Sequence, residues 1–296
     1  MPNEEANFCV GEDMVSIFDS KLRQAVSESD SLLCVGLDPD PEKMPIDDIF
    51  TFCKQIVDTT ANEVCAFKPN LAFFEASGLD GFKVLKDVVD YIHSAFPNKV
   101  VIGDGKRGDI DSSSARYAYS MFEILGFDAT TVNGFGGHDS IKPFLDYSEK
   151  GVFIWCKSSN PDGYQFQGIY DSQQNRPTVF EEMAKMATAW NSNKNIGLVV
   201  GATFPKELAA VRHVAPDIPI LVPGIGSQEG DLSNSLKAGV EKEFPNIFIN
   251  SSRSIIYSSS DPNNYSYAAG QAAYKLKSDI NKILTEISDS NFGMKA

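Results

Sequence analysis

The chain has 296 residues, and its hydrophobic fraction of 42% is enough for a large buried core. Its 26 basic and 40 acidic residues give a formal net charge of −14, which argues against a nucleic-acid partner because such proteins need a basic face to neutralise phosphates. We find no secretory signal in the acidic N-terminus and no apolar run long enough to span a bilayer. We therefore expect a cytoplasmic protein with no membrane partner. The scattered cysteines and histidines suggest neither a disulfide framework nor a metal site.

Eight short apolar segments recur along the chain and predict strands buried on both faces of a parallel sheet, because polar and apolar residues hardly alternate in them. They are Leu32–Leu37, Val64–Lys68, Val100–Asp104, Ala129–Val132, Val152–Cys156, Gly197–Gly201, Ile218–Val222 and Ile247–Asn250. Helical patterns between and after them are clearest at Leu79–Phe96, Ser112–Leu125, Val179–Trp190 and Tyr265–Ile287. For the second of these helices, Asp109 and Asp111 are the predicted N-caps and Gly126 the predicted stop.

Eight strands, each followed by a connection long enough to return, predict an α/β protein with the parallel eight-stranded (β/α)8 TIM-barrel fold. No linker rich in Pro, Gly or Ser divides the chain, so we expect residues 1–296 to form a single domain with frayed ends at 1–13 and 289–296. In such barrels the functional residues lie at the C-terminal ends of the strands.

The densest group of charges follows the third predicted strand, in the segment GDGKRGDI from Gly103 to Ile110. Its GxGxxG spacing matches a dinucleotide-binding fingerprint, with Asp128 as the acidic partner. We reject that interpretation because the carboxylate of Asp104 would repel a pyrophosphate, and because Asp128 precedes its strand and so lies at the wrong rim.

The same segment has a different meaning as Asp-x-Lys-x-x-Asp. Asp104 and Lys106 are two residues apart and can both face the barrel mouth, Asp109 starts the next connection, and Lys68 ends the neighbouring strand. Two lysines and two carboxylates in one cavity would form a strongly coupled charge network. A structural girdle of salt bridges is the alternative.

A phosphate site is predicted from the loops after strands seven and eight, where this fold usually binds phosphate. The segment Pro223–Gly230 (PGIGSQEG) offers glycines and backbone amides, and Ser252-Arg253 offers a guanidinium for bidentate binding. The alternative is two ordinary turns with a solvated arginine.

Three other features are given no catalytic role. The segment Asn133–His138 could shape the pocket or form a flexible turn with a surface histidine, and we favour the turn; Trp155 is expected to belong to the barrel core. The longest connection, Ser158–Thr178, is polar and rich in turn formers.

The ordered motifs GLDPD, FKPN, DGKRGDI, CKSSNP, VPGIGSQ and SSR resemble those of the orotidine 5′-monophosphate decarboxylase family, in the branch whose central motif reads DxKRGDI. The resemblance runs from about Leu32 to Arg253. It implies a carboxy-lyase of de novo pyrimidine biosynthesis that converts orotidine 5′-monophosphate to uridine 5′-monophosphate and CO2, without a cofactor or a metal. It also implies a homodimer with shared active sites.

The resemblance assigns a role to each charged residue of the network. Lys68, Asp104 and Lys106 are implied to be catalytic, with Lys106 as the proton donor. Asp109 is implied to reach into the neighbouring subunit's site and to complete a Lys-Asp-Lys-Asp array there.

The resemblance also implies substrate contacts. Asp38 would hold a ribose hydroxyl, and Ser159 would contact the pyrimidine ring, with Ser158 as the less favoured register. Gln228 and Arg253 would bind the phosphate. The other implied substrate-binding residues are Asn70, Ser113 (where the family commonly has Thr), Pro223 and Ser252.

Two other functions remain open at this point. A phosphosugar enzyme of the same superfamily would share Asp-x-Lys-x-x-Asp but would use Mg2+, and a non-catalytic barrel could sense a nucleotide. The GLDPD and KPN motifs favour the decarboxylase. A fused orotate phosphoribosyltransferase is not expected, because the residues outside the barrel motifs are too few for a second domain.

Overall fold

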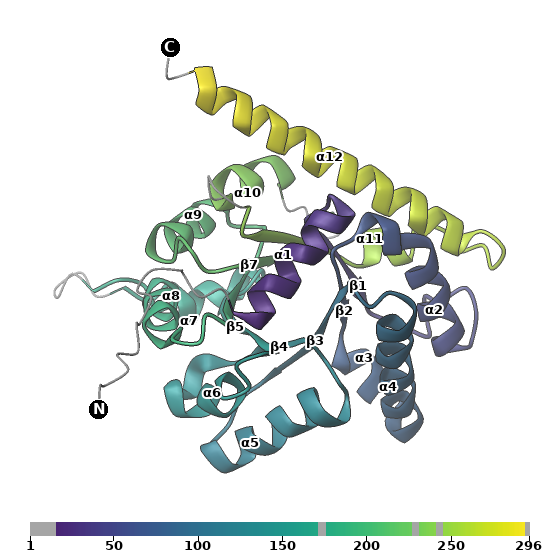
Figure 1. Cartoon of the computed structure of the whole chain (residues 1–296), viewed down its shortest axis with the longest axis horizontal. Coiled ribbons are helices and arrows are strands. Elements are labelled where there is room, and N and C mark those ends of the chain that lie inside the picture. The colour runs from purple at the N-terminus through teal and green to yellow at the C-terminus, as the bar shows by residue number, and fades with distance from the viewer. Residues whose placement is uncertain (1–15, 171–175, 227–230, 241–244, 294–296) are drawn as a thin grey trace, which may run out of the picture.

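The computed structural model describes residues 16–170, 176–226, 231–240 and 245–293. Within these residues, eight parallel strands close into a barrel in chain order, as Figure 1 shows. The strands are β1 Leu33–Leu37, β2 Ala66–Pro69, β3 Val100–Arg107, β4 Ala129–Val132, β5 Gly151–Lys157, β6 Ile196–Val200, β7 Ile220–Pro223 and β8 Ile247–Ser251. The predicted TIM barrel is confirmed.

The predicted strand positions agree with these bounds to within two residues, except at the end of β3. This strand continues to Arg107, and its register against β4 shifts between Gly103 and Arg107. A second register shift, between Trp155 and Lys157, interrupts the pairing of β5 with β6. Such bulges turn side chains out of strict alternation, and these two lie beside the mouth of the barrel.

Helices surround the barrel (Figure 1). They are α1 Ile17–Ser29, α2 Ile49–Thr60, α3 Leu71–Glu75, α4 Gly78–Ala95, α5 Asp111–Tyr119, α6 His138–Leu145, α7 Tyr164–Gln167, α8 Val179–Trp190, α9 Pro205–Val214, α10 Leu232–Gly239, α11 Arg253–Ile256 and α12 Tyr265–Gly293. Short 3-10 or π segments lie at Ala61–Glu63, Ser120–Ile124, Gly134–Gly136 and Pro161–Gly163. Among the described helices, none is long and apolar enough to cross a membrane.

The start of α5 differs from the prediction, because neither aspartate caps it. Ile110 occupies the N-cap position, and Asp111 is the first helical residue. The Asp109 carboxylate instead accepts from its neighbour's amide, Ile110 N, at 2.7 Å, and Asp109 N donates to Ser114 Oγ at 3.0 Å. The predicted stop is confirmed: Gly126 has φ +80°, a left-handed conformation that suits glycine.

The last helix, α12, crosses the outside of the barrel past α2, α11 and α10 (Figure 1). It continues to Gly293, and the predicted fraying at 289–293 stays a prediction. Predicted fraying at 1–13 and 294–296 falls outside the described residues.

The N-terminal mouth of the barrel is closed by α1. Phe18 packs edge-on against Phe153, with ring centroids 6.1 Å apart, and a Cβ on Gly151 would come within 2.3 Å of the Phe18 ring. Asp128 lies at this same end, where it accepts from Lys21 Nζ at 2.5 Å and from Val101 N at 2.9 Å. Its place far from the opposite mouth confirms that Asp128 is not part of a nucleotide fingerprint.

Candidate active site

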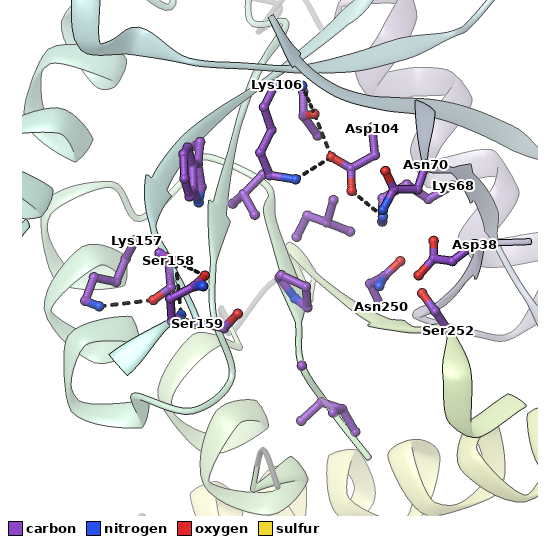
Figure 2. A pocket seen from close by; sticks show the side chains of 18 of the residues that line it. Asp38, Lys68, Asn70, Asp104, Lys106, Lys157, Ser158, Ser159, Asn250 and Ser252 are labelled. Carbon is purple, nitrogen blue, oxygen red and sulfur yellow. Dashed lines mark hydrogen bonds and ion pairs between the residues drawn. The ribbon is translucent and has the colours of Figure 1, made fainter. Parts of the chain in front are cut away.

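A cavity opens at the C-terminal mouth of the barrel, and strand ends or the loops after them supply its walls. Figure 2 shows the charged side chains that point into it. The lining residues are Asp38, Lys68, Asn70, Asp104, Lys106, Thr131, Trp155, Lys157, Ser158, Ser159, Asn160, Val199, Leu221, Pro223, Gly224, Ile225, Asn250, Ser252 and Arg253.

A carboxylate held between two ammonium groups forms the centre of the cavity (Figure 2). Asp104 Oδ2 accepts from Lys68 Nζ at 2.5 Å, and Asp104 Oδ1 accepts from Lys106 Nζ at 2.6 Å. Thr131 Oγ1 adds a third hydrogen bond to Asp104 Oδ1, at 2.9 Å. The neighbouring strands β2, β3 and β4 thus fix one carboxylate from three sides.

The two lysines differ in their access to the cavity. The side chain of Lys68 is 4% exposed, whereas that of Lys106 is 37% exposed. Lys68 is therefore an internal counter-charge, and Lys106 is the ammonium that a molecule in the cavity would meet.

Charge pairing controls the protonation of this centre. Burial alone would raise the pKa of Asp104, but the ammonium groups of Lys68 and Lys106 hold that pKa well below its usual range. Burial opposes the charged form of Lys68 in turn, but Asp104 and Asp38 together raise its pKa above the ordinary value. The pair is therefore ionised at neutral pH.

The backbone at Lys106 is unusual for a residue with a Cβ. Its φ of +44° lies in the left-handed region, which L-residues rarely adopt. Lys106 N donates to Thr131 Oγ1 at 3.0 Å, so the same hydroxyl that binds Asp104 also anchors this backbone. Strained backbone of this kind concentrates at functional sites.

A second polar group lies where β1 and β8 meet. Figure 2 shows Asp38, Asn250 and Ser252 together on the side of the cavity opposite Ser158 and Ser159. Asp38 Oδ1 and Asn250 Oδ1 are both buried, and neither has a hydrogen-bond partner in the structure. Burial raises the pKa of Asp38, against the neighbouring ammonium of Lys68, which lowers it.

Gly36 makes room for this group. A Cβ on Gly36 would lie 1.9 Å from Ser252 Oγ and 3.5 Å from Asn250 Oδ1. Any side chain at position 36 would therefore displace the side chain of Ser252.

The turn after β5 holds one serine tightly and leaves the next one open. Ser158 N donates to Gln167 Oε1 at 2.9 Å, Ser158 O accepts from Lys157 Nζ at 3.0 Å, and Ser158 Oγ donates to Asn160 Oδ1 at 2.6 Å. Ser159 lines the cavity and has only its carbonyl engaged, by Thr203 Oγ1 at 3.2 Å. Ser159 is thus the serine with a hydroxyl to offer a ligand.

Lys157 supports that turn from behind. Its side chain is fully buried, and Nζ lies 4.0 Å from the centroid of the Phe204 ring, a cation–π contact. Burial lowers the pKa of Lys157. The ammonium points away from the cavity in Figure 2, so this lysine positions the serine turn rather than facing a ligand.

Side-chain hydrogen bonds join the loops after β7 and β8. Gly224 and Gly226 have φ of +106° and +93°, which expose backbone in a tight turn. Ser251 Oγ donates to Ile225 O at 3.3 Å and lies 2.6 Å from Ser254 Oγ, which links the two loops. Arg253 is exposed and lines the cavity.

Most of the sequence-predicted site residues come together here. The cavity brings together Asp38, Lys68, Asn70, Asp104, Lys106, Ser159, Pro223, Ser252 and Arg253. Asp109 and Ser113 do not line it: Asp109 is exposed and Ser113 is half-buried on α5. Gln228 lies outside the described residues.

Trp155 and the segment after β4 differ from their predictions. Trp155, predicted to be core, is half-buried and lines the cavity, because it lies two residues after Phe153 on the same face of β5 and so at the mouth end of the barrel interior. The predicted flexible turn with a surface histidine is instead a 3-10 turn, Gly134–Gly136, followed by α6. Its His138 is half-buried, with its ring 5.4 Å from that of Trp190.

Several residues that line the cavity were not predicted from the sequence. Thr131 follows Thr130 in one predicted strand and Asn250 ends another, so polar residues in these otherwise apolar strands were the available signal. Among the residues that the structure describes, no group of three His, Cys, Asp or Glu side chains is arranged to hold a metal ion.

Comparison with known proteins gives a consistent family relationship. The model of the orotidine 5′-phosphate decarboxylase / HUMPS family matches residues 31–267. The chain is 44% identical to the orotidine 5′-phosphate decarboxylase of Aromatoleum aromaticum over 272 residues, which cover 90% of this chain and 98% of that protein.

Similarity to solved structures supports the same family relationship. Leishmania donovani OMP decarboxylase is 37% identical with a TM-score of 0.78, and the match covers 91% of this chain and 98% of that chain. Leishmania donovani UMP synthase is 38% identical with a TM-score of 0.80, and the match covers 91% of this chain but 57% of that longer chain.

Proposed function

The chain belongs to the orotidine 5′-phosphate decarboxylase / HUMPS family, and on that premise we propose how its residues divide the work of its reaction. The reaction is the family's: orotidine 5′-monophosphate loses CO2 from C6 and gives uridine 5′-monophosphate, a step of pyrimidine biosynthesis. The enzyme is a carboxy-lyase. The observation that carries the residue assignment is the Asp104 carboxylate held between Lys68 and Lys106 in the cavity.

In our proposal Lys106 is the proton donor. Breaking the bond between C6 and the carboxyl carbon leaves the electron pair on C6, and a proton from Nζ of Lys106 then forms the new C6–H bond. The ammonium also stabilises the negative charge that develops at C6. The exposure of this ammonium to the cavity, its fixed bond to Asp104 and its anchored backbone support the assignment.

In this proposal Asp104 raises the free energy of the bound substrate before CO2 leaves. Its carboxylate stays ionised and would lie beside the substrate carboxylate, so that repulsion between the two is relieved as CO2 leaves. Lys68 keeps Asp104 charged and in place, because their ion pair is buried and hydrogen-bonded.

Substrate contacts are distributed around the mouth. Asp38 is proposed to accept from a ribose hydroxyl, supported by its unpartnered buried oxygen, and Ser159 to contact the pyrimidine ring, supported by its free hydroxyl. Arg253 is proposed to bind the phosphate beside the linked loops after β7 and β8. The remaining proposed contacts are Asn70, Pro223, Gln228 and Ser252.

The proposal includes a homodimer in the cytoplasm, with Asp109 and Ser113 serving the partner's site. Both residues lie outside the cavity of their own chain, Asp109 on the connection from β3 to α5 and Ser113 in the first turn of α5. Apolar side chains nearby in sequence or on the next loop are left in solvent: Ile110 is 70% exposed and Phe135 is 75% exposed. An exposed apolar surface next to functional residues is typical of a subunit interface. Free thiols at Cys34, Cys53, Cys65 and Cys156 fit a reducing compartment.

The direct test uses EDTA-treated enzyme and orotidine 5′-monophosphate, with the ultraviolet change followed as orotidylate becomes uridylate. We expect metal-free conversion. Neither turnover nor product binding would instead support a Mg2+-dependent phosphosugar enzyme, and product binding without turnover would support a sensor.

The residue assignment is tested with two variants in the same assay. Lys106→Ala should lose roughly 100- to 10,000-fold in kcat while still binding uridine 5′-monophosphate. Near-normal turnover in that variant would end the assignment of the proton donor. Arg253→Ala should mainly raise KM, and an unchanged KM would contradict the phosphate role.

A further inference from the structure

We propose that Gln167 is a positioning residue for recognition of the pyrimidine ring, because its side chain holds the turn that presents Ser159. The proposal rests on the decarboxylase function above and deepens it. It also gives a role to α7, the short helix in the long connection after β5, which neither the sequence motifs nor the reaction explains.

The contact joins α7 to the start of its own connection. Gln167 is the last residue of α7 and is half-buried. Its Oε1 accepts from Ser158 N at 2.9 Å, so the side chain reaches back to the residue that directly follows β5. The approach depends on Gly163, since a Cβ there would lie 3.1 Å from Gln167 Oε1 and 3.2 Å from the Cβ of Ser158. The helix is thereby held against the turn.

The amide of Ser158 needs this acceptor because the strand ladder ends just before it. Lys157 is the last residue of β5, and its carbonyl accepts from Gly201 N at 2.9 Å. Ser158 is 4% exposed, so an unpaired N–H there would be cut off from water at a cost in free energy. The side chain of Gln167 supplies the acceptor that a continuing strand would have supplied.

Two other side chains hold the same turn from other directions. Ser158 O accepts from Lys157 Nζ at 3.0 Å, and Ser159 O accepts from Thr203 Oγ1 at 3.2 Å. With Gln167 on the amide, the main chain is held on both sides of the Ser159 hydroxyl. The hydroxyl is therefore oriented before a ligand arrives, which lowers the entropy cost of binding.

Loss of this orientation should affect the ring alone. The contacts proposed for the sugar and the phosphate come from other strands, since Asp38 follows β1 and Arg253 follows β8. Figure 2 shows the two serines on the side of the cavity opposite Asp38. Without Gln167 the ligand would have to order the turn, and only a ligand with the ring would meet that cost. A residue with a merely structural role would weaken every ligand or none.

The experiment compares a ligand that has the ring with one that lacks it. Uridine 5′-monophosphate and ribose 5-phosphate are titrated by calorimetry into wild-type enzyme, Gln167→Met and Gln167→Glu. Methionine has a similar length without a strong acceptor, and glutamate keeps an acceptor at the same place. We expect Gln167→Met to bind uridine 5′-monophosphate about 5- to 30-fold more weakly, the cost of ordering about one residue, and to bind ribose 5-phosphate as the wild type does. Gln167→Glu should recover most of the affinity for uridine 5′-monophosphate.

The matched control is Gln165→Met, an exposed position on the same helix, which should leave both affinities unchanged. Equal weakening of both ligands in Gln167→Met, unchanged binding of uridine 5′-monophosphate, or no recovery in Gln167→Glu would each overturn the proposal. If Gln167→Met does not fold, Gln167→Ala is used with the same criteria. Wild-type turnover of orotidine 5′-monophosphate is measured separately. Its absence would overturn the proposed function, whereas wild-type turnover with unchanged nucleotide binding in Gln167→Met would overturn this inference alone.

Discussion

Lys68 and Asp104 form an ion pair of 2.5 Å in which neither side chain is more than 8% exposed. A pair this deeply buried stabilises the fold only while both partners are present, because the remaining charge would otherwise be desolvated without compensation.

Replacing Asp104 with Asn should therefore lower the free energy of unfolding by about 3 kcal/mol at pH 7, as measured by urea denaturation. The depressed pKa of Asp104 sets the sign of the pH dependence. A carboxylate with a lowered folded-state pKa contributes stability above its unfolded pKa of about 3.9 and loses it as the pH falls through the folded-state value. The difference between wild type and variant should shrink below about pH 4.

The matched control for that variant is Asp87→Asn, which breaks an exposed pair with Lys83 on α4. It should change stability by no more than about 0.5 kcal/mol. Equal effects of the two substitutions would show that burial does not govern the Lys68–Asp104 pair.

Asp38 should behave in the opposite way. Its folded-state pKa is raised by burial, so the folded state binds its proton more tightly than the unfolded chain does. Stability from this group is full below the unfolded pKa and falls as the pH rises through the folded-state pKa. Asp38→Asn should therefore make the free enzyme more stable than wild type at pH 7 while raising KM. Thermal unfolding across pH 4 to 8 checks the first effect, and a variant less stable than wild type at pH 7 would contradict it.

The proposed sharing of active sites between subunits predicts complementation between inactive chains. Lys106→Ala and Asp109→Ala are each expected to be inactive alone, but a mixed dimer would contain one complete site. Equal mixtures, after subunit exchange, should regain about a quarter of wild-type activity, since half the dimers are mixed and each has one working site of two.

The control mixture pairs Lys106→Ala with Asp104→Asn. Both residues line the same cavity of one chain, so no complete site can form and no activity should return. Recovery in both mixtures, or in neither, would count against Asp109 serving the partner's site.

Gly36 should be intolerant of even a methyl group. The Cβ of Gly36→Ala would stand 1.9 Å from Ser252 Oγ and would displace that side chain, which is a proposed substrate contact. We therefore expect at least about a 10-fold loss of kcat/KM. Adding Ser252→Gly removes both atoms of the clash and should recover part of that loss. A double variant no better than Gly36→Ala would show that the contact with Ser252 is not the cause.

Much of this architecture could be predicted from the amino-acid sequence. The barrel follows from eight apolar strands with return connections, because such a pattern has few ways to bury both faces. The charged centre follows from the strand ends: Lys68, Asp104 and Lys106 close their strands and so meet at one mouth.

The remaining features depend on tertiary detail that spacing does not encode. Trp155 lines the cavity, although its sequence pattern matches core, because it lies at the mouth end of the barrel interior. Neither Asp109 nor Asp111 caps α5, because the Asp109 carboxylate instead accepts from the adjacent Ile110 amide. Asn250 looks like an interruption in an apolar strand until the closed barrel brings β8 next to β1.

The left-handed backbone of Lys106 costs stability at a position where the proposed chemistry needs a lysine side chain. An L-residue there costs about 1–2 kcal/mol relative to glycine, so Lys106→Gly should melt above Lys106→Ala although both lack the ammonium. Among variants that lack the ammonium, a library screened for survival at high temperature should therefore enrich glycine over alanine at residue 106, whereas lysine also keeps its ion pair with Asp104. A screen that demands product would keep the lysine, and its survivors would show how far the rest of the barrel compensates for this one unfavourable torsion.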